Sequence, residues 1–257
     1  MSSNQTFPKA KMREENEVKN IIAVMSGKGG VGKSLVTSLL AVEANRAGKK
    51  VGILDADLIG ASIPSFFGIK EKMFFTEDMI YPVMTPKNIE VVSIGLLMDK
   101  IEDPLIWRGP LLSATVKQFF EKTIWHKLDY LFLDLPPGTG DVALTVMQSF
   151  EITGIVIVAT PSSIVCPIVE KSLEMAKTMN TKVVGLVENM SCFVCPHCKN
   201  KTEILGKSEI ETIRHKYNII NTEIIPYDND LALMANRGKI EEIKKSYLAS
   251  FLQSISQ

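Results

Sequence analysis

Short runs of consecutive apolar residues alternate along the chain with longer segments in which apolar residues recur at helical spacing. The apolar runs lie at residues 21–25, 51–55, 130–134, 154–160 and 182–189. The segments of helical spacing lie at residues 34–46, 142–149, 168–179 and about 207–217. Continuous apolar strands separated by helices are typical of a parallel sheet covered by helices on both faces. The pattern therefore predicts a doubly wound α/β fold with a mainly parallel sheet.

Three parts of the chain depart from this alternation. Residues 1–19 are polar and charged, and we expect them to form a flexible leader before a single domain over residues 20–257. Residues 56–106 are irregular and rich in Phe, Met and Pro, and we expect an excursion above the carboxyl edge of the sheet. Residues 240–255 place their apolar side chains on one stripe, which predicts an amphipathic helix packed on the core.

Charge and composition exclude several classes of function. The 29 Lys and Arg residues balance the 29 Asp and Glu residues, so no broad basic field exists to hold nucleic acid or an anionic membrane. The polar N-terminus has no apolar signal core, and no apolar run approaches the length of about 18 residues that a spanning helix needs. We therefore expect a cytoplasmic protein with no nucleic-acid partner and no membrane partner.

A glycine-rich loop follows the first apolar run. Residues 26–34 read SGKGGVGKS, and residues 27–34 fit the phosphate-binding pattern G-x-x-x-x-G-K-[ST] between a strand and a helix. Glycines let successive backbone N–H groups converge on phosphate oxygens at the N-terminus of the following helix. The predicted nucleotide-binding residues of this loop are Gly27, Lys28, Gly29, Gly30, Val31, Gly32, Lys33 and Ser34.

The end of this loop carries the chemistry of a nucleotide triphosphate site. Lys33 is expected to neutralise the β and γ phosphates of ATP, and the Ser34 hydroxyl to ligate Mg²⁺. A glycine-rich turn without a ligand is the alternative, but it does not account for the strand, the spacing and the helix together. Lys28 is a second lysine for which the pattern alone gives no role.

Two further apolar strands end in aspartate, at Asp55 and Asp134. In a doubly wound sheet, the carboxyl ends of the strands beside the first strand form the ligand crevice. Asp134, followed by LPPGTGD, is placed like a Walker B aspartate that holds Mg²⁺. Asp57 lies just past its strand, where it can orient the attacking water. Without the phosphate-binding loop, Asp55 and Asp57 would be interpreted as a solvated strand end.

A cysteine pair near the end of the last apolar run indicates a metal site. The sequence CPHC places Cys195 and Cys198 close enough to bind one metal ion or one edge of a cluster. Zinc and iron–sulfur sites usually need four ligands, and the chain has no second CxxC. A two-fold dimer supplies the missing ligands, because it brings the same two cysteines together from each subunit.

A third cysteine leaves the number of ligands open. Cys192 extends the pattern to C-x₂-C-x₂-C, the spacing of the first three ligands in a bacterial ferredoxin. It is a candidate extra ligand. We favour the interpretation that it is a bystander, because a small residue of a type that is often buried needs no metal. His197 is expected to face the solvent.

The loop GKGGVGKS, with lysine in second place, resembles that of the deviant Walker A ATPases, P-loop NTPases of the SIMIBI type that include MinD, ParA, the nitrogenase iron protein and the arsenite-pump ATPase. Five segments are similar to the Mrp/ApbC branch, which carries and assembles iron–sulfur clusters: DADLIGASIPSFFG, WRGPLLSATVKQF, DYLFLDLPPGTGDVALT, VENMSCFVCPHC and IPYDNDLALMANRGK. The resemblance runs from about Asn20 to Lys239, nearly the whole chain.

This resemblance implies a homodimer whose protomers face each other across paired nucleotides. It implies that Lys28 crosses to the partner's phosphates, and that Asp57 orients the attacking water while Asp134 holds Mg²⁺. It also implies that Asn189 hydrogen-bonds adenine and that Pro226 lines the base. A turn residue at a strand end remains the alternative for Asn189.

For the cysteines, the resemblance implies a 4Fe-4S cluster that bridges the dimer through Cys195 and Cys198. The chain departs from the family pattern at three positions. Cys192 stands where Tyr or Gly is usual, Ile168 where Asp is expected, and Lys199 where Gly follows the cysteine pair.

These observations predict an ATP-dependent carrier that binds a labile iron–sulfur cluster at a dimer interface, receives it from cluster donors and transfers it to apoproteins. Its ATPase activity is expected to be slow and to act as a switch. One alternative is a MinD-like or ParA-like positioning ATPase, which the neutral charge balance and the cysteines disfavour. Another is a dimeric ATPase stabilised by structural zinc.

Overall fold

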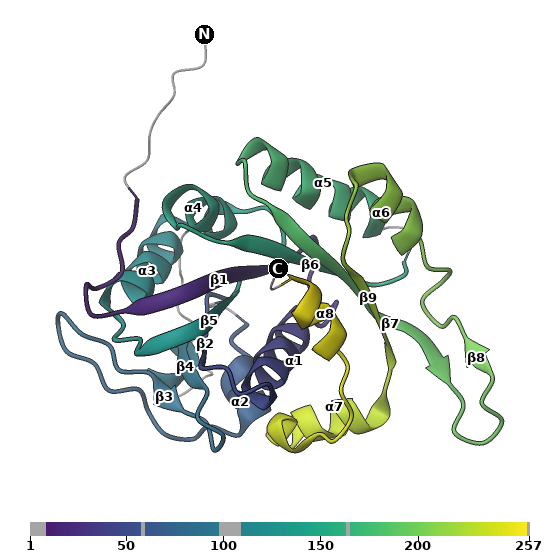
Figure 1. Cartoon of the computed structure of the whole chain (residues 1–257), viewed down its shortest axis with the longest axis horizontal. Helices are drawn as coiled ribbons and strands as arrows, with labels where there is room; N and C mark the ends of the chain where they lie inside the picture. The colour runs from purple at the N-terminus through teal and green to yellow at the C-terminus, as the bar shows by residue number, and fades with distance from the viewer. Residues whose placement is uncertain (1–8, 58–59, 98–108, 163–164, 256–257) are drawn as a thin grey trace, which may run out of the picture.

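The computed structural model describes residues 9–57, 60–97, 109–162 and 165–255, which form a nine-stranded sheet with helices on both faces (Figure 1). The strand order is β3-β4-β2-β5-β1-β6-β7-β8, and β9 also pairs with β7. All pairs are parallel except β3 with β4 and β7 with β8. The strands are β1 (Glu17–Ser26), β2 (Val51–Asp55), β3 (Val83–Met84), β4 (Glu90–Ser93), β5 (Lys127–Asp134), β6 (Gly154–Ala159), β7 (Val183–Val194), β8 (Lys201–Thr202) and β9 (Thr222–Tyr227).

Helices cover this sheet in two layers. In Figure 1, α3, α4, α5 and α6 lie on one side of the sheet, whereas α1, α7 and α8 lie on the other. The short helix α2 packs against α1 and α7. This arrangement confirms the predicted doubly wound α/β fold. The helices are α1 (Lys33–Arg46), α2 (Ile63–Phe67), α3 (Gly109–Lys122), α4 (Asp141–Ser149), α5 (Val165–Thr178), α6 (Ile210–Tyr217), α7 (Asn229–Asn236) and α8 (Ala249–Ile255).

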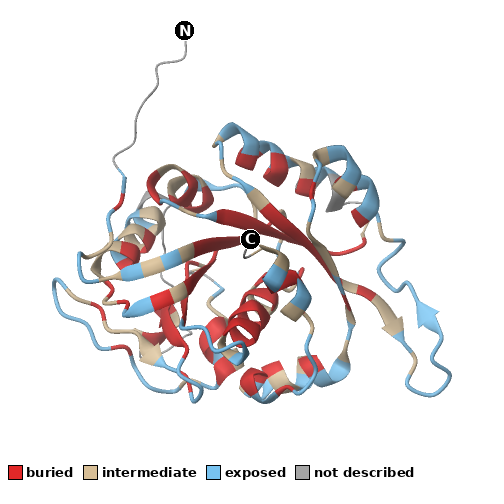
Figure 2. Ribbon diagram, in the orientation of Figure 1, coloured by how far each residue is buried: buried red, intermediate tan, exposed pale blue. Residues whose placement is uncertain are grey.

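The middle of the sheet is buried on both faces because its strands are apolar throughout. Ile22, Ala23 and Val24 of β1 have almost no exposed surface, and Figure 2 shows the same burial along the neighbouring strands. The register places Asp134, at the end of β5, beside both Val24 of β1 and Asp55 of β2. The ends of three adjacent strands therefore meet at the edge where the glycine-rich loop begins.

Residues 56–106 correct one expectation in part, because two short strands of this segment belong to the sheet and do not lie above it. β4 pairs in parallel with β2, and β3 pairs with β4, so the segment extends the sheet at its edge. Val91 and Val92 of β4 are fully buried, but such a short apolar run between polar residues does not stand out as a strand. Helix α2 of the same segment lies outside the sheet, next to the glycine-rich loop.

The further elements α3, β8, β9 and α7 were also not predicted from the sequence. α3 begins at Gly109, directly after residues 98–108, which lie outside the described part of the chain. The strand β9 contains Pro226, and proline is usually confined to edge strands because it cannot donate a ladder hydrogen bond. β9 does lie at an edge, where it pairs with β7.

The N-terminal boundary also differs from the expectation. β1 begins at Glu17, before the expected boundary at Asn20. The preceding residues 9–16 contact the domain, because Ala10 is buried and its N–H donates a 2.9 Å hydrogen bond to the carbonyl of Ser149. The rest of the expected leader, residues 1–8, lies outside the described residues.

Residues 240–255 pack on the core as predicted, but the single helix expected there is wrong. A 3₁₀ turn over Ile240–Glu242 is followed by a loop and then by α8. Tertiary hydrogen bonds hold the loop instead of a helix. Glu241 accepts a 2.5 Å hydrogen bond from the Thr85 hydroxyl, and the N–H of Tyr247 donates to Glu43. The apolar residues still buried on the core are Ile240, Ile243, Leu248, Phe251 and Leu252.

Two glycines join α2 to α7 at a contact with no room for a side chain. Gly68 ends α2 with φ +66°, and Gly238 follows α7 with φ +69°. A Cβ on Gly238 would lie 2.6 Å from the Cα of Gly68, closer than carbon atoms approach in proteins. Both backbones are also in the left-handed region that favours glycine.

We expect Gly238→Ala to lower the free energy of unfolding by about 2 kcal/mol or more, because it combines backbone strain with a steric clash. Urea denaturation measures this. Gly48→Ala is the matched control, since Gly48 has φ +74° but its Cβ would meet no atom within 4 Å. Equal losses of stability in the two variants would show that the clash with Gly68 does not matter.

Candidate functional site

The glycine-rich loop connects the end of β1 to the start of α1. Gly30 and Gly32 adopt left-handed φ values of +79° and +82°, and Gly32 is the N-cap of α1. The loop borders a hollow of about 240 Å³, which Asp57, Phe66 and Pro137 also line. The first residues of α1, Lys33 to Leu35, line this hollow, and the first backbone N–H groups of a helix have no partner within the helix. Such a geometry is suited to bind phosphate.

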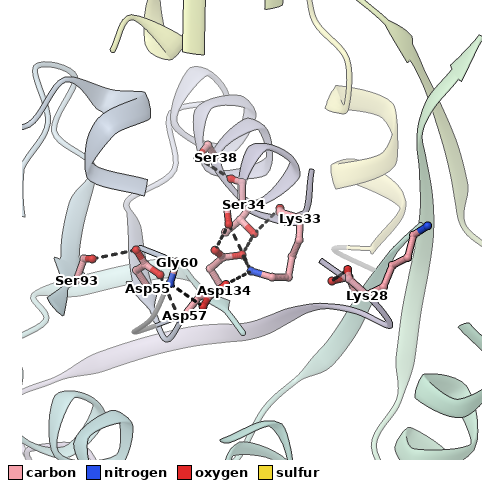
Figure 3. A network of polar contacts seen from close by, with 11 residues as sticks. Lys28, Lys33, Ser34, Ser38, Asp55, Asp57, Gly60, Ser93 and Asp134 are labelled. Atoms are coloured by element: carbon pink, nitrogen blue, oxygen red, sulfur yellow. Dashed lines mark hydrogen bonds and ion pairs between the residues drawn. The ribbon is translucent and has the colours of Figure 1, made fainter. Parts of the chain in front are cut away.

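Asp134 gathers the polar side chains at the start of α1 into one cluster (Figure 3). Its carboxylate lies 2.7 Å from Lys33 Nζ and accepts a 2.5 Å hydrogen bond from the Ser34 hydroxyl. Thr37 donates a third hydrogen bond, of 2.8 Å, to the same carboxylate. Asp134 has no exposed surface and Lys33 is 5% exposed, so the two side chains form a buried ion pair. The hydrogen bonds from Ser34 and Thr37 satisfy the carboxylate further, as a buried ion pair requires.

The structure thus brings together Lys33, Ser34 and Asp134, three of the predicted site residues. Their donor set also fits Mg²⁺, because a hydroxyl and a carboxylate supply the oxygen ligands that this ion prefers. Sequence reasoning missed Thr37. A signal was present, since Thr37 lies four residues after Lys33 and therefore on the same face of α1.

The two aspartates of the DAD sequence occupy different environments. Asp55 has no exposed surface, and its carboxylate accepts a 2.9 Å hydrogen bond from the Ser93 hydroxyl. Burial, together with the neighbouring charge of Asp134, raises the pKa of Asp55 to about 8. Asp57 lines the hollow, and its carboxylate lies 3.9 Å from Lys33 Nζ. Asp57 therefore borders the hollow beside the glycine-rich loop, whereas Asp55 is buried in the protein behind it.

Lys28 does not join this cluster. Its backbone carbonyl accepts a 3.0 Å hydrogen bond from the Ser26 hydroxyl, which holds the start of the loop. Its side chain is directed away from Lys33 and Asp134 in Figure 3. The side chains of Lys28 and Lys33 therefore point in different directions from the loop.

Asn189 and Pro226 line a second hollow of about 220 Å³, which adjoins the first. The two hollows share Gly30, Gly32, Leu35 and Phe66 in their walls. Most of the other lining side chains come from α7 and are apolar, as suits a flat heterocyclic base. Sequence reasoning missed Leu35 and Phe66, because neither belongs to the phosphate-binding pattern.

Asn189 also contacts the glycine-rich loop directly. Its side-chain amide donates a 3.0 Å hydrogen bond to the carbonyl of Val31. A Cβ on Gly32 would lie only 2.2 Å from the same amide nitrogen. Asn189 is 3% exposed and thus fixed against the loop on two sides. The end of β7 is therefore in contact with the phosphate-binding loop.

Cys195 and Cys198 lie in the tight turn between β7 and β8, which projects from the body of the molecule (Figure 1). Residues 190–207, which contain this turn, the end of β7 and all of β8, are called the cysteine hairpin below. The turn is closed by a 3.0 Å hydrogen bond from the N–H of Lys199 to the carbonyl of Cys195. Both thiols are free, Cys198 is exposed, and Cys195 is partly exposed.

Backbone N–H groups of the turn point at the sulfur of Cys195. Hydrogen bonds from the N–H groups of Cys198 and His197, aided by the Cys198 thiol, lower the pKa of Cys195 below its ordinary value. The thiolate is the form that binds metals, so this turn favours ligation. His197 is exposed, as predicted.

Cys192 lies on β7, before the turn. Among the described residues, no three His, Cys, Asp or Glu side chains form a group able to hold a metal ion. Within one chain, Cys192 therefore does not complete a three-ligand site with Cys195 and Cys198.

Among the helices of the described residues, none has the length and apolar character needed to cross a membrane.

Comparisons with known proteins agree with this geometry. A family model described as "ParA: NUBPL iron-transfer P-loop NTPase" matches residues 17–257. A Clostridium perfringens protein named iron-sulfur cluster carrier protein is 44% identical over 233 residues, which cover 88% of this chain and 82% of that protein. A protein of the same name from Methanocaldococcus jannaschii is 43% identical over 236 residues, covering 89% and 80%.

A solved structure shares the same architecture. It is a nucleotide-binding protein from Archaeoglobus fulgidus in complex with ADP, with cobalt found in it. It superimposes with a TM-score of 0.81 at 43% identity, and the match covers 91% of this chain and 92% of that one. The glycine-rich loop, the Asp134 cluster and these matches over nearly the whole chain lead to one conclusion: the chain belongs to the NUBPL-type family of iron-transfer P-loop NTPases.

Proposed function

We propose that this chain is an ATP-dependent iron–sulfur cluster carrier, which binds a labile cluster between the Cys195–Cys198 turns of two subunits and transfers it to apoproteins. One observation carries the proposal: a single strand, β7, contacts the phosphate-binding loop through Asn189 and ends in the exposed cysteine turn. The matched relatives named iron-sulfur cluster carrier proteins support it. In this proposal, the chain from β1 onward acts as one ATPase domain in the cytoplasm, with no membrane or nucleic-acid partner.

The nucleotide part of the proposal assigns a role to each side chain around the two hollows. The loop N–H groups and the N-terminus of α1 bind the phosphates, and Lys33 neutralises their charge. Ser34 and Asp134 hold Mg²⁺, which screens the phosphate charge when it is bound. Asp57, at the rim of the first hollow, orients the attacking water. Asn189 and Pro226 bind the base in the second hollow.

Lys28 is assigned to the partner subunit's nucleotide. Its side chain is directed away from the phosphate cluster of its own chain, which leaves it available to a second subunit. A cation supplied by a partner stabilises the charge that develops on the transferred phosphoryl group. Hydrolysis then depends on the dimer, as suits a slow switch in which nucleotide state reports subunit contact.

The cargo part of the proposal follows from the ligand count. Each chain offers two thiolates in its exposed turn, and a 4Fe-4S cluster takes four. A two-fold dimer brings the two turns together and completes the set. The exposed turn also gives cluster donors and apoprotein recipients access to the cluster, as transfer requires.

Cluster ligation is tested by anaerobic reconstitution with iron and sulfide. We expect the wild-type protein to turn brown with charge-transfer absorbance. Cys195→Ala and Cys198→Ala should each lose it, because only two thiolates, one from each chain, then remain in the dimer for a cluster that takes four. Cys192→Ala is the control and should keep the full absorbance. If the Cys195 and Cys198 variants take up as much cluster as the wild type, the site assignment is wrong. Tightly held zinc alone would favour the structural-metal alternative.

The role of Lys28 is tested by comparing ATP hydrolysis with ATP binding. We expect Lys28→Ala to reduce kcat by about tenfold or more while the Kd for ATP changes little, because its cation acts on the transition state of the partner's nucleotide. Lys49→Ala, at an exposed lysine near the far end of α1, is the control and should behave like the wild type. Normal hydrolysis in Lys28→Ala would show that Lys28 has no role in hydrolysis.

A further inference from the structure

The strand β7 changes direction between the nucleotide hollows and the cysteines. Met190, directly after Asn189, has φ +56°, an uncommon value for a residue with a long side chain. The pairing of β7 with β9 shifts register between Asn189 and Phe193. Strain of this kind persists only where the surrounding structure holds it in place. The cysteine hairpin therefore begins at a bend that lies directly beside the contact with the phosphate-binding loop.

The other end of the cysteine hairpin returns to the same place. Ser208, the residue that follows the hairpin, donates a 2.7 Å hydrogen bond from its hydroxyl to Glu188 on β7. The same hydroxyl accepts a 3.4 Å hydrogen bond from the N–H of Ile210, where α6 begins. Glu188 and Asn189 are consecutive residues. Both ends of the hairpin are thus tied to β7 at the point where it contacts the nucleotide site.

The carboxylate of Glu188 has features that are unusual for a group that only stabilises the fold. It is 4% exposed, and its second carboxylate oxygen is buried with no hydrogen-bond partner among the described residues. Burial raises its pKa above the ordinary value, with a further contribution from Glu203, although the Ser208 hydrogen bond opposes the shift. A buried oxygen without a partner is costly, so such groups are rare in static cores.

The side chain of Glu188 also has space beside it. It borders a hollow at the carboxyl ends of β6 and β7, lined by Thr160, Ser162, Leu186 and Ile210 among others. The side chain of Glu188 is therefore held by Ser208 and also borders a small hollow of about 30 Å³.

We propose that Glu188 and Ser208 are positioning residues that couple the nucleotide site to the cysteine hairpin. The proposal deepens the carrier function and rests on it. A nucleotide that displaces Asn189 or the loop at Val31 also moves Glu188, because the two residues adjoin on one strand. The shift is passed to the hairpin at both ends, at Met190 and at Ser208. The bound nucleotide then determines how rigidly the cysteine hairpin holds Cys195 and Cys198.

Hydrogen exchange of the full-length protein without a cluster tests this coupling. We expect Mg-ATP to slow exchange of the backbone amides of residues 190–207 in the wild type. Ser208→Ala should reduce that slowing by about threefold to tenfold, the effect of losing one buried hydrogen bond. Ser208→Thr, which keeps the hydroxyl, should restore it. Thr178→Ala deletes a hydroxyl that bonds the carbonyl of Glu174 on α5, and is the matched control.

Protection of the phosphate-binding loop, residues 27–34, reports ATP binding in the same experiment. It should persist in every variant, which separates lost coupling from lost binding or folding. Glu188→Leu removes the acceptor at similar volume and should match Ser208→Ala. If the hairpin responds to ATP equally in the wild type and in both variants, or not at all in the wild type, the coupling is overturned. Failure of cluster uptake, measured separately, would instead overturn the carrier function.

Discussion

The architecture of the site depends on the buried carboxylate of Asp134. It ends the central strand β5 with no exposed surface, so its charge must be matched by neighbours. Lys33, Ser34 and Thr37 provide this match from the first turns of α1. The same contacts fix the start of α1 against the sheet and thereby shape the loop before it. The contacts that satisfy a buried charge in the core therefore also hold the phosphate-binding loop in place.

The phosphate cluster and the cysteine turn each lack groups that a single chain does not supply. The phosphate cluster does not include Lys28, and the turn at Cys195 and Cys198 offers two ligands where a cluster takes four. A second subunit would complete both. β7 connects them within each chain, since it holds Asn189 against the phosphate-binding loop and continues into the cysteine hairpin. This proximity is the physical basis of the proposed link between nucleotide state and cluster carriage.

Much of this was predictable from the sequence, because local patterns record local constraints. The apolar strands, the glycine-rich loop and the aspartates at strand ends predicted the sheet and the cluster of Lys33, Ser34 and Asp134. Elements stabilised by distant partners left no such pattern. β4 is short, Phe66 reaches the site from the five-residue helix α2, and the 3₁₀ turn at Glu241 is held by Thr85 and not by helix propensity. The tie between Glu188 and Ser208 likewise joins residues with no shared motif.

The central claim is that one cluster is shared by two chains. Native mass spectrometry of the anaerobically reconstituted protein tests it most directly, because it counts chains and iron atoms in the same particle. The account predicts a dimer that carries a single four-iron cluster. A cluster held by one chain alone, or a dimer that holds only zinc, would contradict it.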